Sequence, residues 1–188
     1  MSTLPPDEPL SLEEVKANLR VTSLDEDDLI EGLIAAAREH VEQVTGLVLT
    51  AREVVQTAAD FGRYGLDIRA WPIRSITSVG YVDTHGTAQT LTSVGYVASL
   101  VQRPVRLVPA FGTAWPSLAG LPAAVVITLQ AGYATPVDVP APIRQAMHLL
   151  VAHWYANRSA VIAGGQAAAV EVPMGVAALL ASYRRWSV

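Results

Sequence analysis

The stretch Ala124-Val125-Val126-Ile127-Thr128-Leu129 reads as a short buried strand, and a long apolar-striped segment follows it at residues 143–158. The strand is rich in β-branched residues, which favour a sheet. A proline-punctuated loop joins the two, and Pro140 and Pro142 favour the start of a helix there. The spacing of three and four predicts one buried helix face, made of Ile143, Ala146, Met147, Leu150, Val151 and Trp154. All of these features favour packing and contact rather than catalysis.

Two further helices are predicted near the N-terminus. Ser11-Leu12-Glu13-Glu14 is a capping box, in which the side chains of Ser11 and Glu14 satisfy each other's free backbone N–H groups. A second helix is expected to begin near Ser23 or Asp25 and to end at Gly46. Its apolar positions follow the helical period and are Leu29, Ile30, Leu33, Ile34, Ala37, Val41 and Val44.

Residues 47–135 have the pattern of short strands separated by prolines and glycines. The segment Asp83-Thr84-His85-Gly86 is expected to be a hairpin turn with glycine at its left-handed position. A last short helix is expected after Pro173. The predicted fold class is therefore α+β, a small bundle of three to four helices with a β-rich insertion between the second and third long helices. Residues 1–46 and 136–188 would form the helical core and residues 47–135 the insertion.

The composition indicates an assembly protein that does not cross a membrane. Apolar residues make up 51% of the 188-residue chain, against about 45–50% in typical soluble proteins. We expect the surplus to lie in subunit interfaces, although a composition rich in alanine and valine would also account for it. No apolar run reaches the ~18 residues of a membrane span. The N-terminus has no secretory signal pattern, so assembly in the cytoplasm is expected.

The charge of the chain is distributed unevenly along the sequence. Residues 1–45 contain eleven acidic and three basic groups, whereas residues 139–188 contain one acidic and four basic groups. This polarity suits a protein with different neighbours at its two ends. It does not suit a protein that grips duplex DNA, which would have a basic face.

Searching the sequence for catalytic or metal-binding patterns gives little. No nucleophile elbow, phosphate-binding loop or zinc-protease motif occurs, and the chain has no cysteine. His148 and His153 are five residues apart and cannot share a helix face as a metal pair would. An acidic cluster at the start of the second helix could provide carboxylates for a small metal-dependent hydrolase, but it fits a helix start better. We therefore expect no enzyme activity, cofactor or bound metal.

Aromatic and basic residues suggest where contacts form. The C-terminal run Tyr183, Arg184, Arg185 and Trp186 contains the residue types that concentrate binding energy at interfaces. Alternatively, the run is a frayed terminus with Trp186 folded back on its own domain. Trp71, Trp115 and Phe111 lie beside prolines in the β-rich block, as either core or docking-loop residues.

Three features occur in an order that resembles the tailed-phage head–tail connector, or adaptor, family. The first is Ser11-Leu12-Glu13-Glu14 with the acidic run Asp25-Glu26-Asp27-Asp28. The second is Ala131-Gly132-Tyr133 followed by Val139-Pro140. The third is His153-Trp154-Tyr155 with Asn157-Arg158, followed by Pro173, Gly175-Val176, Leu179-Leu180 and Tyr183-Arg184. The resemblance spans nearly the whole chain, but residues 50–120 match only in style.

The resemblance implies a structural protein of a phage or gene transfer agent neck, assembled in the bacterial cytoplasm. Members form a ring, usually dodecameric, under the portal protein ring and extend the DNA channel. On its other side the ring would bind a stopper or tail-completion protein; alternatively, this chain would itself be another neck or tail-completion protein. Tyr183 to Trp186 would dock to the portal. As a hypothesis, acidic residues would line the lumen and let genomic DNA pass without specific binding: Asp25, Glu26, Asp27, Asp28 and Glu31.

Overall fold

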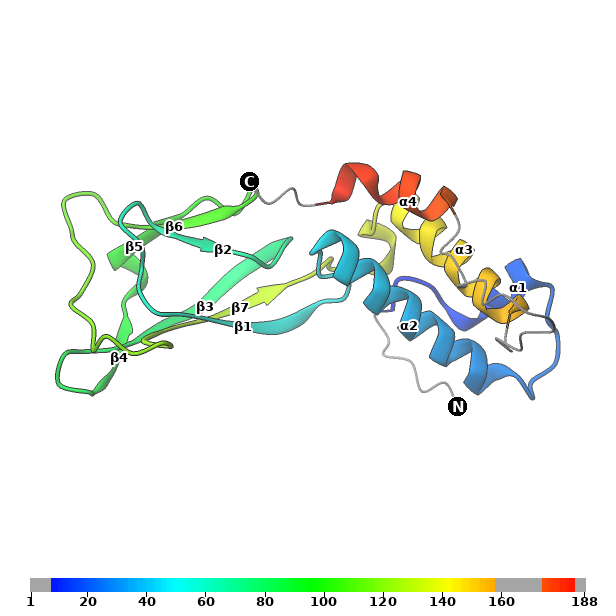
Figure 1. Ribbon diagram of the computed structural model, residues 1–188, viewed down its shortest axis with the longest axis horizontal. Coiled ribbons are helices and arrows are strands. Elements are labelled where there is room, and N and C mark those ends of the chain that lie inside the picture. The colour runs from blue at the N-terminus through cyan, green and yellow to red at the C-terminus, as the bar shows by residue number, and fades with distance from the viewer. Residues whose placement is uncertain (1–7, 158–173, 185–188) are drawn as a thin grey trace, which may run out of the picture. The chain divides into compact units, whose positions relative to one another are not determined.

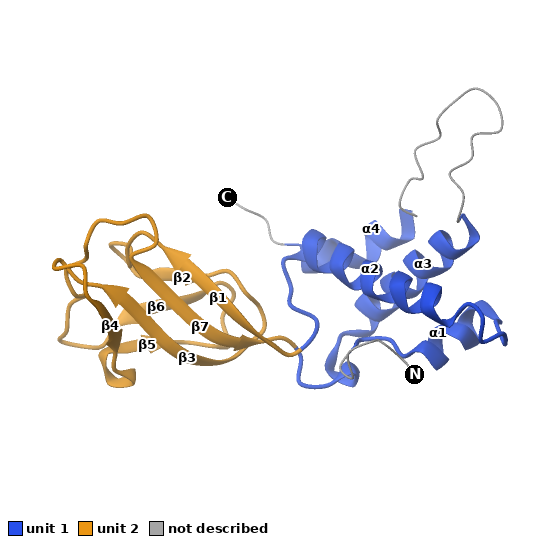
Figure 2. Cartoon of the chain, turned by 90° about the horizontal axis from the view of Figure 1, so that it is seen from below, with its two compact units in different colours: residues 1–50, 133–188 blue, residues 51–132 orange. Residues whose placement is uncertain are grey.

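The computed structural model describes residues 8–157 and 174–184 of the chain, which divides into two compact units (Figure 2). One unit comprises residues 1–50 and 133–188 and is helical; the other comprises residues 51–132 and is all-β. The predicted α+β class, with a β-rich region between the second and third helices, is confirmed. None of the described helices is long and apolar enough to cross a membrane.

The helical unit contains α1 (Leu12–Leu19), α2 (Asp27–Thr45), α3 (Ala141–Ala156) and α4 (Met174–Leu180). The helices α2, α3 and α4 pack against one another, as Figure 1 shows. Two short 3₁₀ helices, η2 (Pro136–Asp138) and η3 (Ala181–Tyr183), precede α3 and follow α4.

The core of the helical unit contains most of the predicted apolar positions, but in α2 Leu33 and Val44 are half-buried and Leu29 is exposed. From α2 the side chains of Ile30, Ile34, Ala37 and Val41 are fully buried, and from α3 those of Ile143, Ala146, Met147, Leu150 and Val151. Trp154 is only half-buried and meets the ring of His40 edge-on at 6.1 Å. The helix α2 ends at Gly46, whose φ of 68° is the left-handed conformation expected of a helix C-terminal glycine.

Two sequence predictions about helix starts need correction. The helix α2 begins at Asp27 rather than near Ser23 or Asp25, because the Ser23 hydroxyl accepts a bond from the Asp25 N–H in a preceding turn. The Ser11 side chain caps α1 by accepting from the Glu14 N–H at 3.1 Å. The Glu14 carboxylate, however, accepts hydrogen bonds from α3 instead of completing the capping box.

The β unit consists of two antiparallel sheets. One has the strand order β1 (Arg52–Ala58), β7 (Val125–Ala131), β3 (Ile73–Val82) and β4 (Ala88–Leu91). The other has the order β2 (Leu66–Ile68), β6 (Val105–Pro109) and β5 (Tyr96–Ala98), with the 3₁₀ turn η1 (Ser93–Gly95) before β5. The turn at residues 83–86 joins β3 to β4, and Gly86 has a φ of 79°, as the hairpin prediction requires.

The strand β7 is central to the first sheet and alternates between buried and half-buried positions. Val125, Ile127, Leu129 and Ala131 point into the unit and are fully buried. On one side β7 pairs with β1, so that Arg52 faces Ala131; on the other it pairs with β3. The chain therefore enters and leaves the β unit on neighbouring strands.

The two sheets are joined at one side by a side chain that replaces strand pairing. The amide of Gln56 on β1 donates to the carbonyl of Asp67 at 2.9 Å and accepts from the N–H of Arg69 at 2.8 Å. These are the two bonds that a neighbouring strand would make with β2. Gln56 thereby satisfies backbone groups at a sheet edge.

Candidate functional site

The acidic residues at the start of α2 divide into exposed and structural members. Asp25 and Asp28 are exposed. Asp27 forms an ion pair with Lys16 of α1, whose ammonium group also donates to the Ser23 carbonyl at 2.8 Å. Glu26 accepts a hydrogen bond from the Tyr155 hydroxyl of α3.

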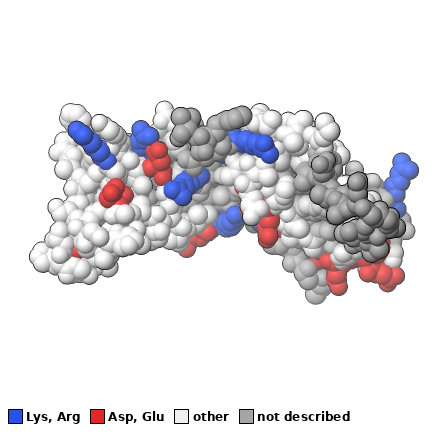
Figure 3. Space-filling model, viewed as in Figure 1, with Lys and Arg blue, Asp and Glu red and all other residues white. Residues whose placement is uncertain are grey.

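Glu31 does not face solvent, since it is only 3% exposed within the chain. On the face drawn in Figure 3, most of the acidic side chains visible on the helical unit gather at one end of it. A free acidic surface is therefore available from Asp25 and Asp28, while Glu26 and Asp27 tie the start of α2 to α3 and α1.

A second polar cluster joins α1 to α3. Both carboxylate oxygens of Glu14 accept from the Arg144 guanidinium, at 2.7 and 2.8 Å, and His148 Nε2 lies 3.1 Å from Glu14 Oε1. Burial raises the pKa of Glu14, but the hydrogen bonds and charges of His148 and Arg144 outweigh it, and the net pKa is lowered. Glu14 is therefore an ionised link between two helices.

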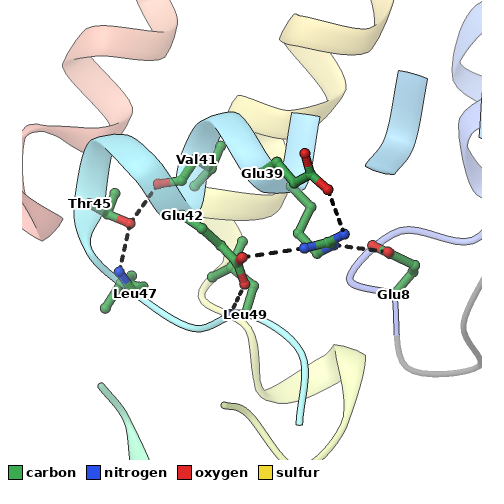
Figure 4. Close-up of polar contacts among 8 residues, drawn as sticks. Glu8, Glu39, Val41, Glu42, Thr45, Leu47 and Leu49 are labelled. Carbon is green, nitrogen blue, oxygen red and sulfur yellow. Dashed lines mark hydrogen bonds and ion pairs between the residues drawn. The ribbon is translucent and has the colours of Figure 1, made fainter. Parts of the chain in front are cut away.

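A third cluster surrounds the guanidinium group of Arg38 (Figure 4). It binds Glu8 at 2.9 Å, Glu42 at 3.3 Å and Glu39 at 3.5 Å. The other oxygen of Glu42 accepts from the Leu49 N–H at 2.7 Å, and the Thr45 hydroxyl accepts from the Leu47 N–H at 3.2 Å. The side chains of Thr45 and Glu42 thus hold the backbone of Leu47 and Leu49, just before the first segment of the helical unit ends at Thr50.

The C-terminal run is only partly within the described residues. Tyr183 is half-buried and Arg184 is exposed. Arg185 and Trp186 lie outside the described residues.

The aromatic residues whose role the sequence left open have three different environments. Trp115 stacks on Phe61, with ring centres 4.3 Å apart and planes 11° apart, so it belongs to the packing of the β unit. Trp71 is half-buried, and Phe111 is fully exposed. The glycine that follows Phe111 and the nearby prolines are sequence signals of an exposed turn.

The described residues contain no group of three or more histidine, aspartate or glutamate side chains that could hold a metal ion. His148 is bound to Glu14, and His153 lies beside Asn157, with its Nδ1 3.4 Å from the amide nitrogen. The acidic cluster is occupied by helix-to-helix contacts and by exposed aspartates, which leaves the hydrolase hypothesis without a site among the described residues.

The sequence model of one family, described as head completion protein, matches residues 8–186. The chain belongs to the head completion protein family. The family is structural rather than enzymatic, and the predicted relation to phage head–tail connector proteins is confirmed. No curated protein sequence gives a significant match.

Solved structures of gene transfer agent particles contain similar chains. A chain in the neck of an empty particle, computed with C6 symmetry, is 25% identical with a TM-score of 0.76; the match covers 99% of this chain and 94% of that one. A chain in the virion of a native particle is 24% identical, with the same TM-score and coverage. A chain in a native neck computed with C12 symmetry is 22% identical over 92% of this chain and 89% of that one, with a TM-score of 0.67. The last two likenesses concern the fold alone.

Proposed function

We propose that this head completion protein is a head–tail adaptor that forms a ring in the neck of a phage or gene transfer agent particle. The main support is the match to a neck chain over 99% of the sequence, including the β unit. The ring, with twelve copies as in the connector family, lies under the portal, extends the DNA channel and binds a stopper or tail-completion protein. Assembly takes place in the bacterial cytoplasm.

Electron microscopy and a binding assay together test this role. Particles made without the chain should keep filled heads but fail to join tails, and a ring should be visible below the portal when the chain is restored. Purified portal should capture the chain, and tail tube should not. Capture by tail tube alone would instead identify it as another neck or tail-completion protein.

The exposed aspartates of the acidic cluster are proposed to face the lumen, where negative charge repels DNA phosphate. The double variant D25K/D28K should slow DNA delivery, because lysines bind phosphate. A matched variant, E13K/E53K, changes the net charge equally at two other exposed positions and should deliver DNA normally. Equal delivery by both variants would remove the lumen assignment.

The C-terminal run is proposed to dock to the portal through Tyr183, Arg184, Arg185 and Trp186. The reversal R184E/R185E should reduce capture by portal, because guanidinium groups at interfaces contribute strongly to binding. The control is R69E/R74E, a reversal of two exposed arginines of the β unit. If both variants bind portal as well as the unchanged protein, the docking surface lies elsewhere.

A further inference from the structure

An aromatic side chain is held at the tip of a tight turn in the β unit. Phe111 is 105% exposed, more than any other large apolar side chain in the described part of the protein. It occupies the second position of a turn that is closed by a bond from the Thr113 N–H to the Ala110 carbonyl at 3.0 Å. Gly112, at the third position, has a φ of 77°, the value that a type II turn requires there.

This turn is fixed to the second sheet. The Ala110 N–H donates to the Gly95 carbonyl at 3.1 Å, and Tyr96 pairs with Pro109 in the adjoining strands. The Thr113 hydroxyl adds a second bond to the Ala110 carbonyl at 2.7 Å. Because the turn is already ordered, Phe111 would lose little conformational freedom on binding.

The same unit contains an open, mainly apolar pocket of about 360 Å³, lined by Ala59, Asp60, Leu118, Gly120, Leu121 and Pro122. Both walls are hydrogen-bonded in place. Asp60 accepts from the Gly62 N–H at 2.6 Å, and the segment that follows Leu118 is held by a bond from the Ala119 N–H to the Val82 carbonyl at 3.1 Å. The single carboxylate on the wall suits the positive edge of an aromatic ring.

Most of the sequence that forms both features contains no charged residue. No charged residue occurs between Arg106 and Asp138, a stretch that includes the Phe111 turn and most of the pocket lining. In the pocket lining the one charged side chain is that of Asp60, which is exposed and accepts the Gly62 N–H. Two copies can therefore bring these surfaces together with a single carboxylate at the contact. Phe111 does not fill the pocket of its own chain, since its side chain is fully exposed.

We infer that Phe111 of one copy inserts into the Ala59–Leu121 pocket of the β unit of the next copy. A projection and a pocket at different places on one unit make a head-to-tail contact, the kind that closes into a ring. This inference rests on the proposed ring and names a contact between its subunits.

Disulfide trapping in assembled particles tests the contact, because the natural chain has no cysteine. The double variants A59C/A114C and A114C/L121C keep Phe111, because they place one cysteine at exposed Ala114 beside the turn and the other in the pocket lining. They should give a reducible ladder of dimers, trimers and larger species. The control V101C/L121C uses Val101, which is 87% exposed in the same unit, and should give no ladder. A self-paired contact would stop at dimers, and a bond within one chain would leave a monomer; either pattern overturns the inference.

A substitution at the turn gives a second readout that does not depend on disulfide geometry. The variant F111S should lower the yield of joined particles about tenfold or more, as loss of an interface anchor does, and F111Y should keep it. An unchanged yield for F111S overturns the inference. If wild-type particles show no ring of this chain by electron microscopy, the proposed function fails; if the ring is present but no ladder forms, only the subunit contact fails.

Discussion

Among single residues, Arg38 has the largest predicted effect on stability. Its guanidinium group is the partner of Glu8, whose side chain is only 3% exposed. The variant R38M would leave that carboxylate buried without its cation, at a cost of about 3–5 kcal/mol in the free energy of unfolding at pH 7. Urea denaturation measures this change. A control variant, E39Q, removes a partner that is 71% exposed and should change stability by less than about 0.5 kcal/mol.

The pH dependence of R38M follows from the pKa of Glu8. Burial raises this pKa, and the hydrogen bond and charge of Arg38 oppose the rise. A raised pKa means that the folded chain holds the proton more tightly than the unfolded chain does. The penalty of R38M should therefore shrink as the pH falls through that raised pKa. The double variant E8Q/R38M should show no such trend; a constant penalty in R38M would contradict this account.

Glu14 has the opposite pH dependence. Its pKa is lowered, so its stabilising effect is present above its unfolded pKa, near 4.5, and is lost as the pH falls through the folded value. Because Glu14 is 38% exposed, water weakens the interaction, and E14Q should cost about 1 kcal/mol or less. Denaturation at pH 7 and at pH 3 checks this, and the difference from wild type should be smaller at pH 3 than at pH 7.

The sequence showed which residues are charged or polar, but not which of them form contacts between helices. The acidic run at residues 25–28 predicted a helix start, but nothing in its pattern separates exposed Asp28 from Glu26, which accepts a bond from Tyr155 on a helix 129 positions away. The partners of Glu14, which are Arg144 and His148, are similarly distant in the sequence. The contact of Arg38 with Glu8 depends on how the N-terminal segment packs. Such contacts are determined by tertiary packing, which a local pattern does not encode.

At the level of elements, the Gln56 side chain connects the two sheets at one side by two hydrogen bonds. The variant Q56A would leave the Asp67 carbonyl and the Arg69 N–H without their partner, and we expect a loss of about 1–3 kcal/mol. The matched control Q89A removes an exposed glutamine whose amide donates to the Asp83 carboxylate at 3.0 Å and should have a smaller effect. Thermal unfolding compares the two, and equal shifts would mean that Gln56 does not stabilise the connection between the sheets.

Predictions of helices and strands from the sequence were most accurate where a regular hydrophobic pattern extended over many residues. In the predicted apolar stripe of α3 every position but Trp154 is fully buried, whereas in that of α2 Leu33 and Val44 are half-buried and Leu29 is exposed. The hairpin between β3 and β4 followed from its turn residues. The start of α2 was wrong because a serine side chain forms a turn before it. The pairing of β1 with β7 could not be predicted, since strand order depends on contacts between residues far apart in the chain, such as Arg52 with Ala131.

For the whole molecule, we expect each of the two compact units to fold on its own. Arg52 and Ala131 are paired on neighbouring strands, so their Cα atoms are about 4.5–5.5 Å apart, and a short glycine–serine linker can replace residues 51–132. We expect the shortened chain to give a helical circular dichroism spectrum with a cooperative melt. Residues 51–132 alone should give a β spectrum. If neither piece unfolds cooperatively, the units depend on each other.

The structural role was accessible from sequence motifs because they lie mainly in the helical unit, at residues 11–28 and 131–184. Residues 50–120 resembled the family only in style, and the pattern there did not distinguish a core role from a docking role for Trp115 and Phe111. The side-chain environment decides this: one ring is stacked on Phe61 and the other is fully exposed.

The neighbouring positions of β1 and β7 also bear on how such proteins diversify. A genetic exchange with both crossover points near codons 50 and 133 would replace the intervening cassette and join it to the same two places on the bundle. Lineages could in this way acquire a new β module in one event, while the helices inherited from the parent remained unaltered.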